Sequence, residues 1–216
     1  MDFAGAYSPD HLRFLLNGFV VTLKIAAISI ILSFILAAFV GIIRYTKIPV
    51  ISQIFAVVVE IIRNLPLLLI IFFTFFALPE VGIQMSIEMA AIVALTIFES
   101  AMISEVIRSG LNSIDKGQIE AGRSSGLTYV QTLWHIVLPQ ALKRMVPPIV
   151  SQFISLLKDT SLAVVIALPE LMHNAQVINA QNINFIIPIF LLAAFMYWVV
   201  NYTLSIVARK LELKTS

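Results

Sequence analysis

Five long apolar stretches dominate this chain of 216 residues. Each is longer than a typical buried helix of a soluble protein, and a helix that crosses a bilayer needs roughly 20 apolar residues. The charge content agrees, because only 12% of the residues are charged, whereas soluble domains carry about 25%. The chain is therefore predicted to be an all-α membrane protein with five transmembrane helices. The expected spans are approximately Val21–Ile43, Val50–Leu78, Met89–Ile107, Met145–Leu168 and Phe185–Val207.

Basic residues gather after the first, third and fifth stretches, whereas Glu80, Glu88 and Glu170 lie in the loops after the second and fourth. Because Lys and Arg accumulate in cytoplasmic loops, this pattern predicts an N-terminus outside and a C-terminus in the cytoplasm. The basic residues that carry the prediction are Arg44, Lys47, Arg108, Lys116, Arg123, Lys143, Arg144, Arg209, Lys210 and Lys214.

The first stretch is predicted to be an uncleaved span. Its apolar run from Phe14 is too long for a signal peptide, and no basic residue lies among residues 1–12. We expect residues 11–20 to form a short interfacial segment and Lys24 to extend toward the outer surface.

The chain is expected to form a single transmembrane domain over residues 1–216, since no internal repeat or linker divides it. Five spans cannot supply two inverted halves, so symmetry is expected from pairing of two chains. No phosphate-binding G-x-x-x-x-G-K-[ST], H-E-x-x-H, C-x-x-C or G-x-S-x-G motif occurs, and the three histidines lie in separate segments. The sequence predicts neither an enzyme nor a metal site, and no cofactor bound by this chain.

The longest polar segment, about residues 109–144, is termed the 109–144 loop. It is predicted to hold two short helices joined at Gly126, the second one amphipathic and ended by Leu138-Pro139. Its apolar patch has two open interpretations: packing against the chain's own spans, or docking into a groove of a cytoplasmic partner.

The residues of this loop resemble a known motif. Glu120-Ala121-Gly122, Gly126 and Ile136-Val137-Leu138-Pro139 are similar to the E-A-A-x-x-x-G-x(9)-I-x-L-P loop of ABC importer permeases. The third position, Gly122, is often alanine in that family. The resemblance implies that the loop docks onto a partner through Glu120, Ala121, Gly122, Gly126, Leu127, Leu138 and Pro139.

The resemblance extends over about residues 17–171, to the polar amino acid permease subfamily. The similar segments are Asn17-Gly18-Phe19, Thr22-Leu23-Lys24, residues 63–68 (R-N-L-P-L-L), Lys116-Gly117-Gln118, Pro147-Pro148 and residues 157–162 (L-K-D-T-S-L). The family implies a non-catalytic permease subunit in the inner membrane of a prokaryote. Its implied partners are a second permease copy or homologue, two cytoplasmic ATPase subunits that bind ATP and Mg, and an extracytoplasmic substrate-binding protein.

Ionisable residues at membrane depth are functional candidates because they are costly there. Glu60 and Arg63 are expected to form an ion pair, which we favour over substrate contact. Glu99 has no basic residue three or four positions away, so a partner on another helix, protonation or a cationic ligand must compensate it. Glu105 and Arg108 are expected to pair near the cytoplasmic end of the third span.

The fourth span carries a polar stripe, because Ser151, Ser155 and Asp159 recur at intervals of four. The stripe is suited to a wet cavity or to hydrogen bonds between helices. Thr160 and Ser161 are candidates to donate to a substrate carboxylate. The acids predict a pathway for a polar amino acid, including a cationic one such as arginine, lysine or histidine. The substrate-site candidates are Glu99, Asp159, Ser155, Thr160, Ser161 and Glu60.

Two other functions compete with an ATP-driven importer. One is a self-contained secondary transporter or channel driven by an ion gradient. The other is a non-transporting scaffold, against which the polar stripe of the fourth span argues.

Overall fold

The computed structural model describes residues 1–215, with side chains described as far as residue 210. The described residues form helices and their connections, without a strand among them, so the all-α class is confirmed. Four helical stretches are long and apolar enough to cross a membrane: Pro9–Thr46, Ile87–Asn112, Tyr129–Ile166 and Ile183–Lys210. Lys214, counted among the basic residues above, lies outside the described side chains.

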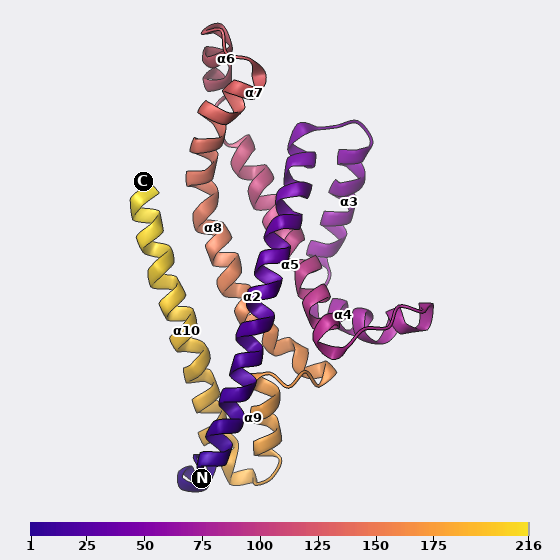
Figure 1. Cartoon of the computed structure of the whole chain (residues 1–216), viewed down its shortest axis with the longest axis vertical. Coiled ribbons are helices and arrows are strands. Elements are labelled where there is room, and N and C mark those ends of the chain that lie inside the picture. Colours follow the sequence, from indigo (N-terminus) through magenta and orange to yellow (C-terminus); the bar gives the residue numbers. More distant parts are fainter. Residues whose placement is uncertain (216) are drawn as a thin grey trace.

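The chain runs up and down along one long axis (Figure 1). Its elements are α1 (Phe3–Ala6), α2 (Pro9–Thr46), α3 (Ile51–Asn64), α4 (Leu67–Phe72), the π-helical turn η1 (Phe73–Ala77), the 3-10 turn η2 (Leu78–Val81), α5 (Ile87–Asn112), α6 (Lys116–Ser124), α7 (Tyr129–Thr132), the π-helical turn η3 (Leu133–Val137), α8 (Leu138–Asp159), the 3-10 turn η4 (Thr160–Ile166), α9 (Leu171–Asn179), the 3-10 turn η5 (Ile183–Phe185) and α10 (Ile186–Thr215).

The second expected span is not one straight helix. α3 and the segment Leu67–Val81 meet at an angle of 104°, and the two together supply the fifth candidate span. The break lies at Leu65, whose backbone is extended (φ −89°, ψ 141°), directly before Pro66. A residue before proline disfavours the helical conformation, and proline lacks the N–H that would continue the ladder. In Figure 1 the α4 arm leaves the bundle sideways.

The second helix of the 109–144 loop does not end at Leu138-Pro139, contrary to the expectation from sequence. α7, η3 and α8 follow one another without a break, and Pro139 lies in the first turn of α8. The π-helical turn over Leu133–Val137 widens the helix just before Pro139, and this change in the hydrogen-bond ladder accommodates a residue that has no N–H to donate. Pro147 and Pro148 likewise lie inside α8 rather than at its start.

The centre of the bundle is the contact between α2 and α5, the most extensive in the molecule. Gly41 of α2 allows close approach, because a Cβ there would lie 2.9 Å from the Ile107 side chain and 3.0 Å from the Ser104 carbonyl oxygen. Small residues serve the same purpose in membrane helix packing generally. Ala90, Ala91 and Ala94 of α5 are buried in the adjoining core cluster.

The prediction of a separate interfacial segment over residues 11–20 is wrong. These residues continue α2, whose start is fixed by Pro9 in its first turn and by the Ser8 hydroxyl, which accepts from His11 N at 3.4 Å. Lys24 forms an ion pair with Glu88 on α5, with Nζ 2.6 Å from Oε2.

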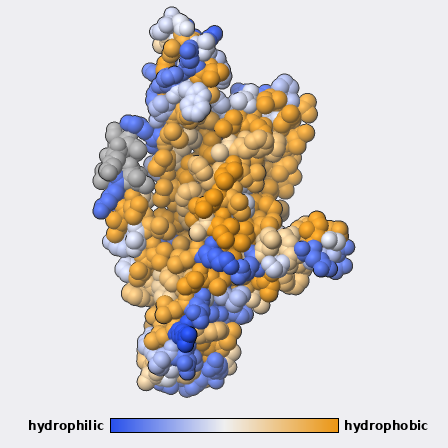
Figure 2. All heavy atoms as spheres, in the orientation of Figure 1, coloured by the Kyte–Doolittle hydropathy of each residue, from blue (hydrophilic) through white to orange (hydrophobic). Residues whose placement is uncertain are grey.

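Hydrophobic surface covers most of the middle of the bundle, and hydrophilic surface gathers at the α6–α7 end and toward the opposite end (Figure 2). This arrangement fits a bilayer around the middle of the helices, because lipid-facing side chains gain nothing by being polar.

Candidate functional site

Glu99 lies inside the bundle on α5 and is only 1% exposed. Its Oε1 atom is buried and has no hydrogen-bond partner. The hydroxyl of Thr96, one turn earlier on the same helix, is likewise buried without a partner. Leaving a buried acceptor unpaired costs about 1–3 kcal/mol, and more for a charged group. These two polar groups are therefore unsatisfied in this conformation of the chain.

Asp159, the last residue of α8, lies close enough to Glu99 for its charge to act on that carboxyl group. The two acids come from neighbouring helices, since α5 packs along α8. Asp159 is half-buried, as is Ser155 one turn before it. The structure thus brings together two of the acids that the sequence marked.

The hydroxyls expected to bind a carboxylate are engaged with the backbone. Thr160 Oγ1 donates to the Leu157 carbonyl at 2.8 Å, and Ser161 Oγ donates to the Lys158 carbonyl at 2.7 Å. A hydroxyl has one hydrogen, so neither can donate to a ligand without giving up this bond. They remain available as acceptors.

Glu60 contacts its own helix rather than the acids of α5 and α8. It is exposed on α3, its carboxylate lies 3.7 Å from Arg63 Nη1, and Asn64 Nδ2 donates to its Oε1 at 3.0 Å. This is the ion pair expected from the spacing of three residues. The Nε of Arg63 is buried without a partner, so the pair leaves a donor unsatisfied.

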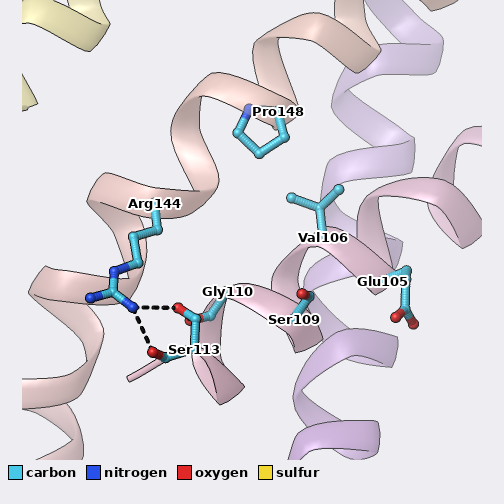
Figure 3. A pocket seen from close by; sticks show the side chains of 7 residues that line it. All are labelled: Glu105, Val106, Ser109, Gly110, Ser113, Arg144 and Pro148. Atoms are coloured by element: carbon cyan, nitrogen blue, oxygen red, sulfur yellow. Dashed lines mark hydrogen bonds between the residues drawn. The ribbon is translucent and has the colours of Figure 1, made fainter. Parts of the chain in front are cut away.

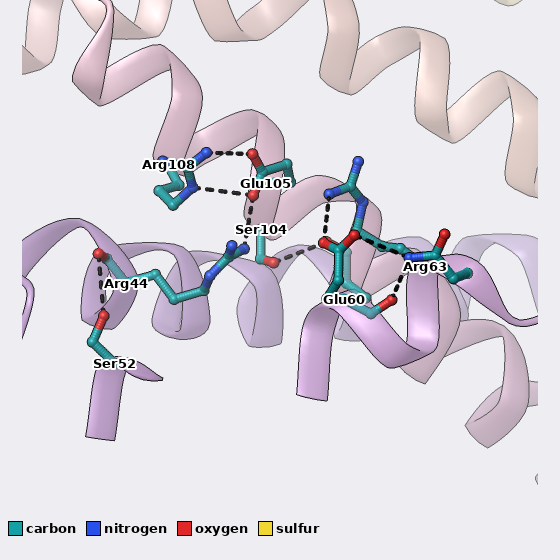
Figure 4. Close-up of polar contacts among 9 residues, drawn as sticks. Arg44, Ser52, Glu60, Arg63, Ser104, Glu105 and Arg108 are labelled. Carbon is teal, nitrogen blue, oxygen red and sulfur yellow. Dashed lines mark hydrogen bonds and ion pairs between the residues drawn. The ribbon is translucent and has the colours of Figure 1, made fainter. Parts of the chain in front are cut away.

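A second charged cluster links three segments near the α6–α7 end (Figure 4). Arg108 pairs with Glu105 through two bonds, Nε to Oε2 at 3.1 Å and Nη2 to Oε1 at 2.5 Å, which confirms the expected pair. Arg44 of α2 joins them, with Nη1 2.9 Å from Glu105 Oε2, and the Ser52 hydroxyl donates to the Arg44 carbonyl at 3.4 Å. Nothing in the sequence spacing indicated Arg44, because it is 61 residues away from Glu105.

A cavity of about 380 Å³ opens between α5 and α8 beside this cluster (Figure 3). Arg144 spans part of it and donates to the carbonyl and hydroxyl oxygens of Ser113 at 2.5 and 3.1 Å. In Figure 3 the Glu105 carboxylate points away from Arg144. The lining residues are Glu105, Val106, Ser109, Gly110, Ser113, Arg144 and Pro148.

The 109–144 loop forms the two expected helices, α6 and α7, joined at Gly126. α6 begins at Lys116, because the Asp115 carboxylate caps it by accepting from Gly117 N at 2.6 Å. Gly126 has φ +88°, a left-handed conformation that other residues rarely adopt. Thr128 and Gln131 then form a capping box that starts α7.

The apolar patch of this loop divides between two surroundings. Ile119, Leu133 and Leu138 pack onto the core cluster of α5 and α8. Val130 and Trp134 remain 60% and 63% exposed. One half of the patch therefore covers the chain's own helices, as the first interpretation expected, and the other half faces outward, where docking onto a partner stays a prediction.

The motif residues of this loop occupy distinct positions. Gly122 is buried against Ile136 and Thr132, and Leu127 and Leu138 are half-buried. The exposed members are Glu120, Ala121, Gly126 and Pro139.

Glu170 is the functional candidate that sequence reasoning missed. Its place between two apolar stretches marked it as a loop acid, yet it is fully buried. Its carboxylate caps α9, with Oε1 2.7 Å from His173 N and Oε2 2.9 Å from Met172 N. An acid directly before a helical run was the available signal, but only for the cap and not for the burial.

Residues 42–216 match the family model described as "binding-protein-dependent transport system inner membrane component". The chain belongs to this family. It is 71% identical over 216 residues to the probable glutamine ABC transporter permease protein GlnP of Bacillus subtilis (strain 168), with 99% of each chain covered. It is 39% identical over 203 residues to the probable glutamine permease GlnM of the same organism, with 94% of each covered.

A solved crystal structure, that of an amino acid ABC transporter with histidines, has the same fold at a TM-score of 0.92. It is 26% identical, and 99% of each chain is covered. The chain is accordingly a permease subunit of an amino acid ABC importer in the inner membrane. Permease subunits of this kind are non-catalytic, and ATP hydrolysis takes place in partner subunits. The family also implies a substrate-binding partner.

Proposed function

We propose that this permease conducts a polar amino acid past Glu99 and Asp159, and that glutamine is its substrate. The observation that carries the proposal is the unpartnered, buried carboxyl oxygen of Glu99 beside Asp159. Ionisable groups inside a membrane bundle are costly, and in transport proteins they mark substrate paths.

Glu99 and Asp159 lack a cationic partner, and the α-ammonium group of a substrate would supply one. Every amino acid substrate carries one, and a charge-assisted hydrogen bond to a carboxylate is about twice as strong as a neutral one. One acid of the pair is enough to bind the α-ammonium group, and the other can then bind the side chain of the substrate. Ser155 lies one turn before Asp159 on α8 and extends the polar lining of the proposed path.

The substrate carboxylate needs donors. Thr160 and Ser161 are proposed to supply them in a second conformation, in which η4 gives up the hydroxyl bonds to Leu157 and Lys158. A transporter must expose its site to both sides in turn, so binding groups engaged in one state and released in another are expected. Glu60 is proposed to line the entrance rather than the site, because Arg63 already pairs with it.

The side chain of the substrate is argued from the relatives. Both B. subtilis relatives described above are named for glutamine, which is neutral. Charge alone favours a cationic amino acid, and the related structure with histidines is compatible with one. We propose glutamine and treat arginine, lysine and histidine as the class to be excluded. The ion-coupled alternative has no support, because the family derives its energy from ATPase partners.

We further propose that two ATPase subunits dock onto the exposed part of the 109–144 loop, and that a second permease copy or a homologue completes the path. The docking residues are then on the cytoplasmic side, with the N-terminus of α2 outside. The exposed Glu120, Val130 and Trp134 form the contact, and Gly126 sets the angle between α6 and α7.

The test is uptake of labelled glutamine by the assembled importer in proteoliposomes. Glu99→Gln removes one charge-assisted acceptor, worth about 1.5–3 kcal/mol, so uptake is expected to fall roughly 10- to 100-fold. Glu80→Gln makes the same change at an exposed position of η2 and should leave uptake unaltered. If the Glu99→Gln variant takes up glutamine as fast as the wild-type importer, Glu99 is not part of the path. Unlabelled arginine competing as strongly as glutamine would assign the cationic class instead.

A further inference from the structure

A buried carboxylate outside the proposed path joins three helices at the N-terminal end of the bundle. Glu170 is 0% exposed, and its Oε2 atom accepts from the Tyr197 hydroxyl of α10 at 2.9 Å. Thr22 of α2, also 0% exposed, lies 3.4 Å from the same oxygen and accepts from Leu171 N at 3.1 Å. α2, α9 and α10 therefore share one polar centre.

Capping α9 does not require this arrangement. A cap needs only an oxygen that accepts from the first backbone N–H groups, and surface Ser, Asn or Asp supplies one without being buried. None of the ion pairs in the described part of the chain includes Glu170, so its burial is compensated by hydrogen-bond donors alone. Burying a carboxylate is expensive, and the contacts that offset it reach to α2 and α10.

Tyr197 connects this centre to the proposed path. The Tyr197 side chain packs against two core clusters. One contains Leu171, Ala175 and Ile189, and the other contains Leu156 and Leu157. The latter two residues directly precede Lys158 and Asp159 on α8.

We infer that Glu170 and Tyr197 are positioning residues, which hold the end of α8 in register with α9 so that Asp159 stays beside Glu99. The inference rests on the proposed function for the role of Asp159. Its geometric basis is separate: the Tyr197 hydroxyl is held by Glu170, and the Tyr197 side chain packs against Leu156 and Leu157 at the end of α8. A displacement of α9 must then break the bond from Tyr197 to Glu170 or move the end of α8.

The test uses the assembled importer in proteoliposomes, with Tyr197→Phe as the main variant because it removes one oxygen and keeps the ring. Glutamine uptake at saturating binding protein is expected to fall between about threefold and tenfold, while ATPase activity without binding protein is unchanged. Tyr202→Phe is the matched control, since Tyr202 is 54% exposed on the same helix. Loss of thermal stability with unaltered uptake per assembled complex would show a merely structural role and overturn the inference.

Double variants separate this inference from the proposed path. Glu170→Gln added to Tyr197→Phe should cause little further loss, because both remove the same bond. Additive losses would mean that the two residues act independently and would overturn the inference. Should Glu170→Gln fail to assemble, Thr22→Val tests the same polar centre from α2: it should lower uptake, and Thr22→Ser should retain it.

Asp159→Asn decides how Tyr197 acts. If Asp159→Asn impairs uptake and Tyr197→Phe adds nothing to it, Tyr197 acts through Asp159 as inferred. If Asp159→Asn leaves uptake unaltered, the proposed path is wrong at Asp159. In that case, a Tyr197→Phe defect still supports the link between α9 and α8.

Discussion

Arg44 on α2 lies 2.9 Å from Glu105 on α5, measured from Nη1 to Oε2. The Arg44 side chain is only 9% exposed, and Glu105 is also held by Arg108 on its own helix. The contact therefore ties the two central helices together at the end of the bundle from which the 109–144 loop extends.

Glu105→Gln should lower the stability of the permease more than Arg44→Met does. Glu105→Gln leaves Arg44 buried without its charge partner, and breaking buried pairs in this way costs up to 3–5 kcal/mol, so about 1–3 kcal/mol is expected at this partly exposed site. Arg44→Met should cost about 1 kcal/mol or less, because Glu105 keeps Arg108. Thermal unfolding of the purified complex measures both. Glu88→Gln, at the exposed pair with Lys24, should change stability by no more than about 1 kcal/mol.

Gly126→Ala should weaken coupling between ATP hydrolysis and uptake. A residue with a Cβ is strained by about 1–2 kcal/mol in the left-handed conformation that Gly126 adopts, so the angle between α6 and α7 should change. Gly82→Ala is the matched control: Gly82 has φ +87°, and a Cβ at either glycine would have no neighbour within 4 Å. Equal stability loss with uncoupling only in Gly126→Ala is the expected result. Equal coupling in both variants would contradict the docking role.

Gly122→Ala, by contrast, should retain coupling. Its Cβ would lie 2.6 Å from Ile136 Cδ1 and 3.0 Å from Thr132 Cγ2, and the first of these atoms is the end of a flexible side chain. The gain in helix propensity, up to about 1 kcal/mol, offsets the shift of Ile136. Thermal unfolding should detect a change smaller than about 1 kcal/mol, with the ATPase-to-uptake ratio unaltered. A loss of coupling would show that close packing at Gly122 is itself part of docking.

Gly18→Ala should be more damaging than Gly110→Ala. A Cβ at position 18 would lie 2.8 Å from the Glu170 carbonyl oxygen, which is backbone and cannot turn aside. A Cβ at position 110 would overlap Met145, whose flexible side chain can adopt another rotamer. We expect Gly18→Ala to cost about 1–3 kcal/mol and Gly110→Ala less, as measured by thermal unfolding. A larger stability loss in Gly110→Ala than in Gly18→Ala would mean that the backbone of α9 shifts more easily than the side chain of Met145 changes its rotamer.

Local patterns in the sequence predicted the parts of this fold that depend on local chemistry. Apolar length predicted the spans, the spacing of three predicted the Glu105–Arg108 pair, and Gly126 predicted the junction in the 109–144 loop. The angle at Leu65-Pro66 was not predicted, because proline indicates a break but not the direction in which the chain leaves it. Pro139 was wrongly taken as a helix end, since the π-helical turn that accommodates it has no simple sequence signal.

The candidate site was predictable only as a set of acids. Sequence marked Glu99, Asp159 and Glu60 as candidates and favoured an ion pair with Arg63 for Glu60; the fold brings the first two together and leaves Glu60 with Arg63 on α3. The sequence could indicate Glu170 as a helix cap, but not its burial among three helices. That burial depends on Thr22 and Tyr197, which lie 148 and 27 residues away.

The bend after α3 has a consequence for the outer surface of the permease. α3 has 14 residues, which span about 21 Å, and a bilayer core is about 30 Å thick. The chain must therefore turn sideways while still at hydrocarbon depth, and the last carbonyl groups of a helix have no partner within it. Lipid tails cannot hydrogen-bond those groups. The flank of the molecule beside Leu65 must accordingly contact water or another protein, and not the acyl chains of the lipids.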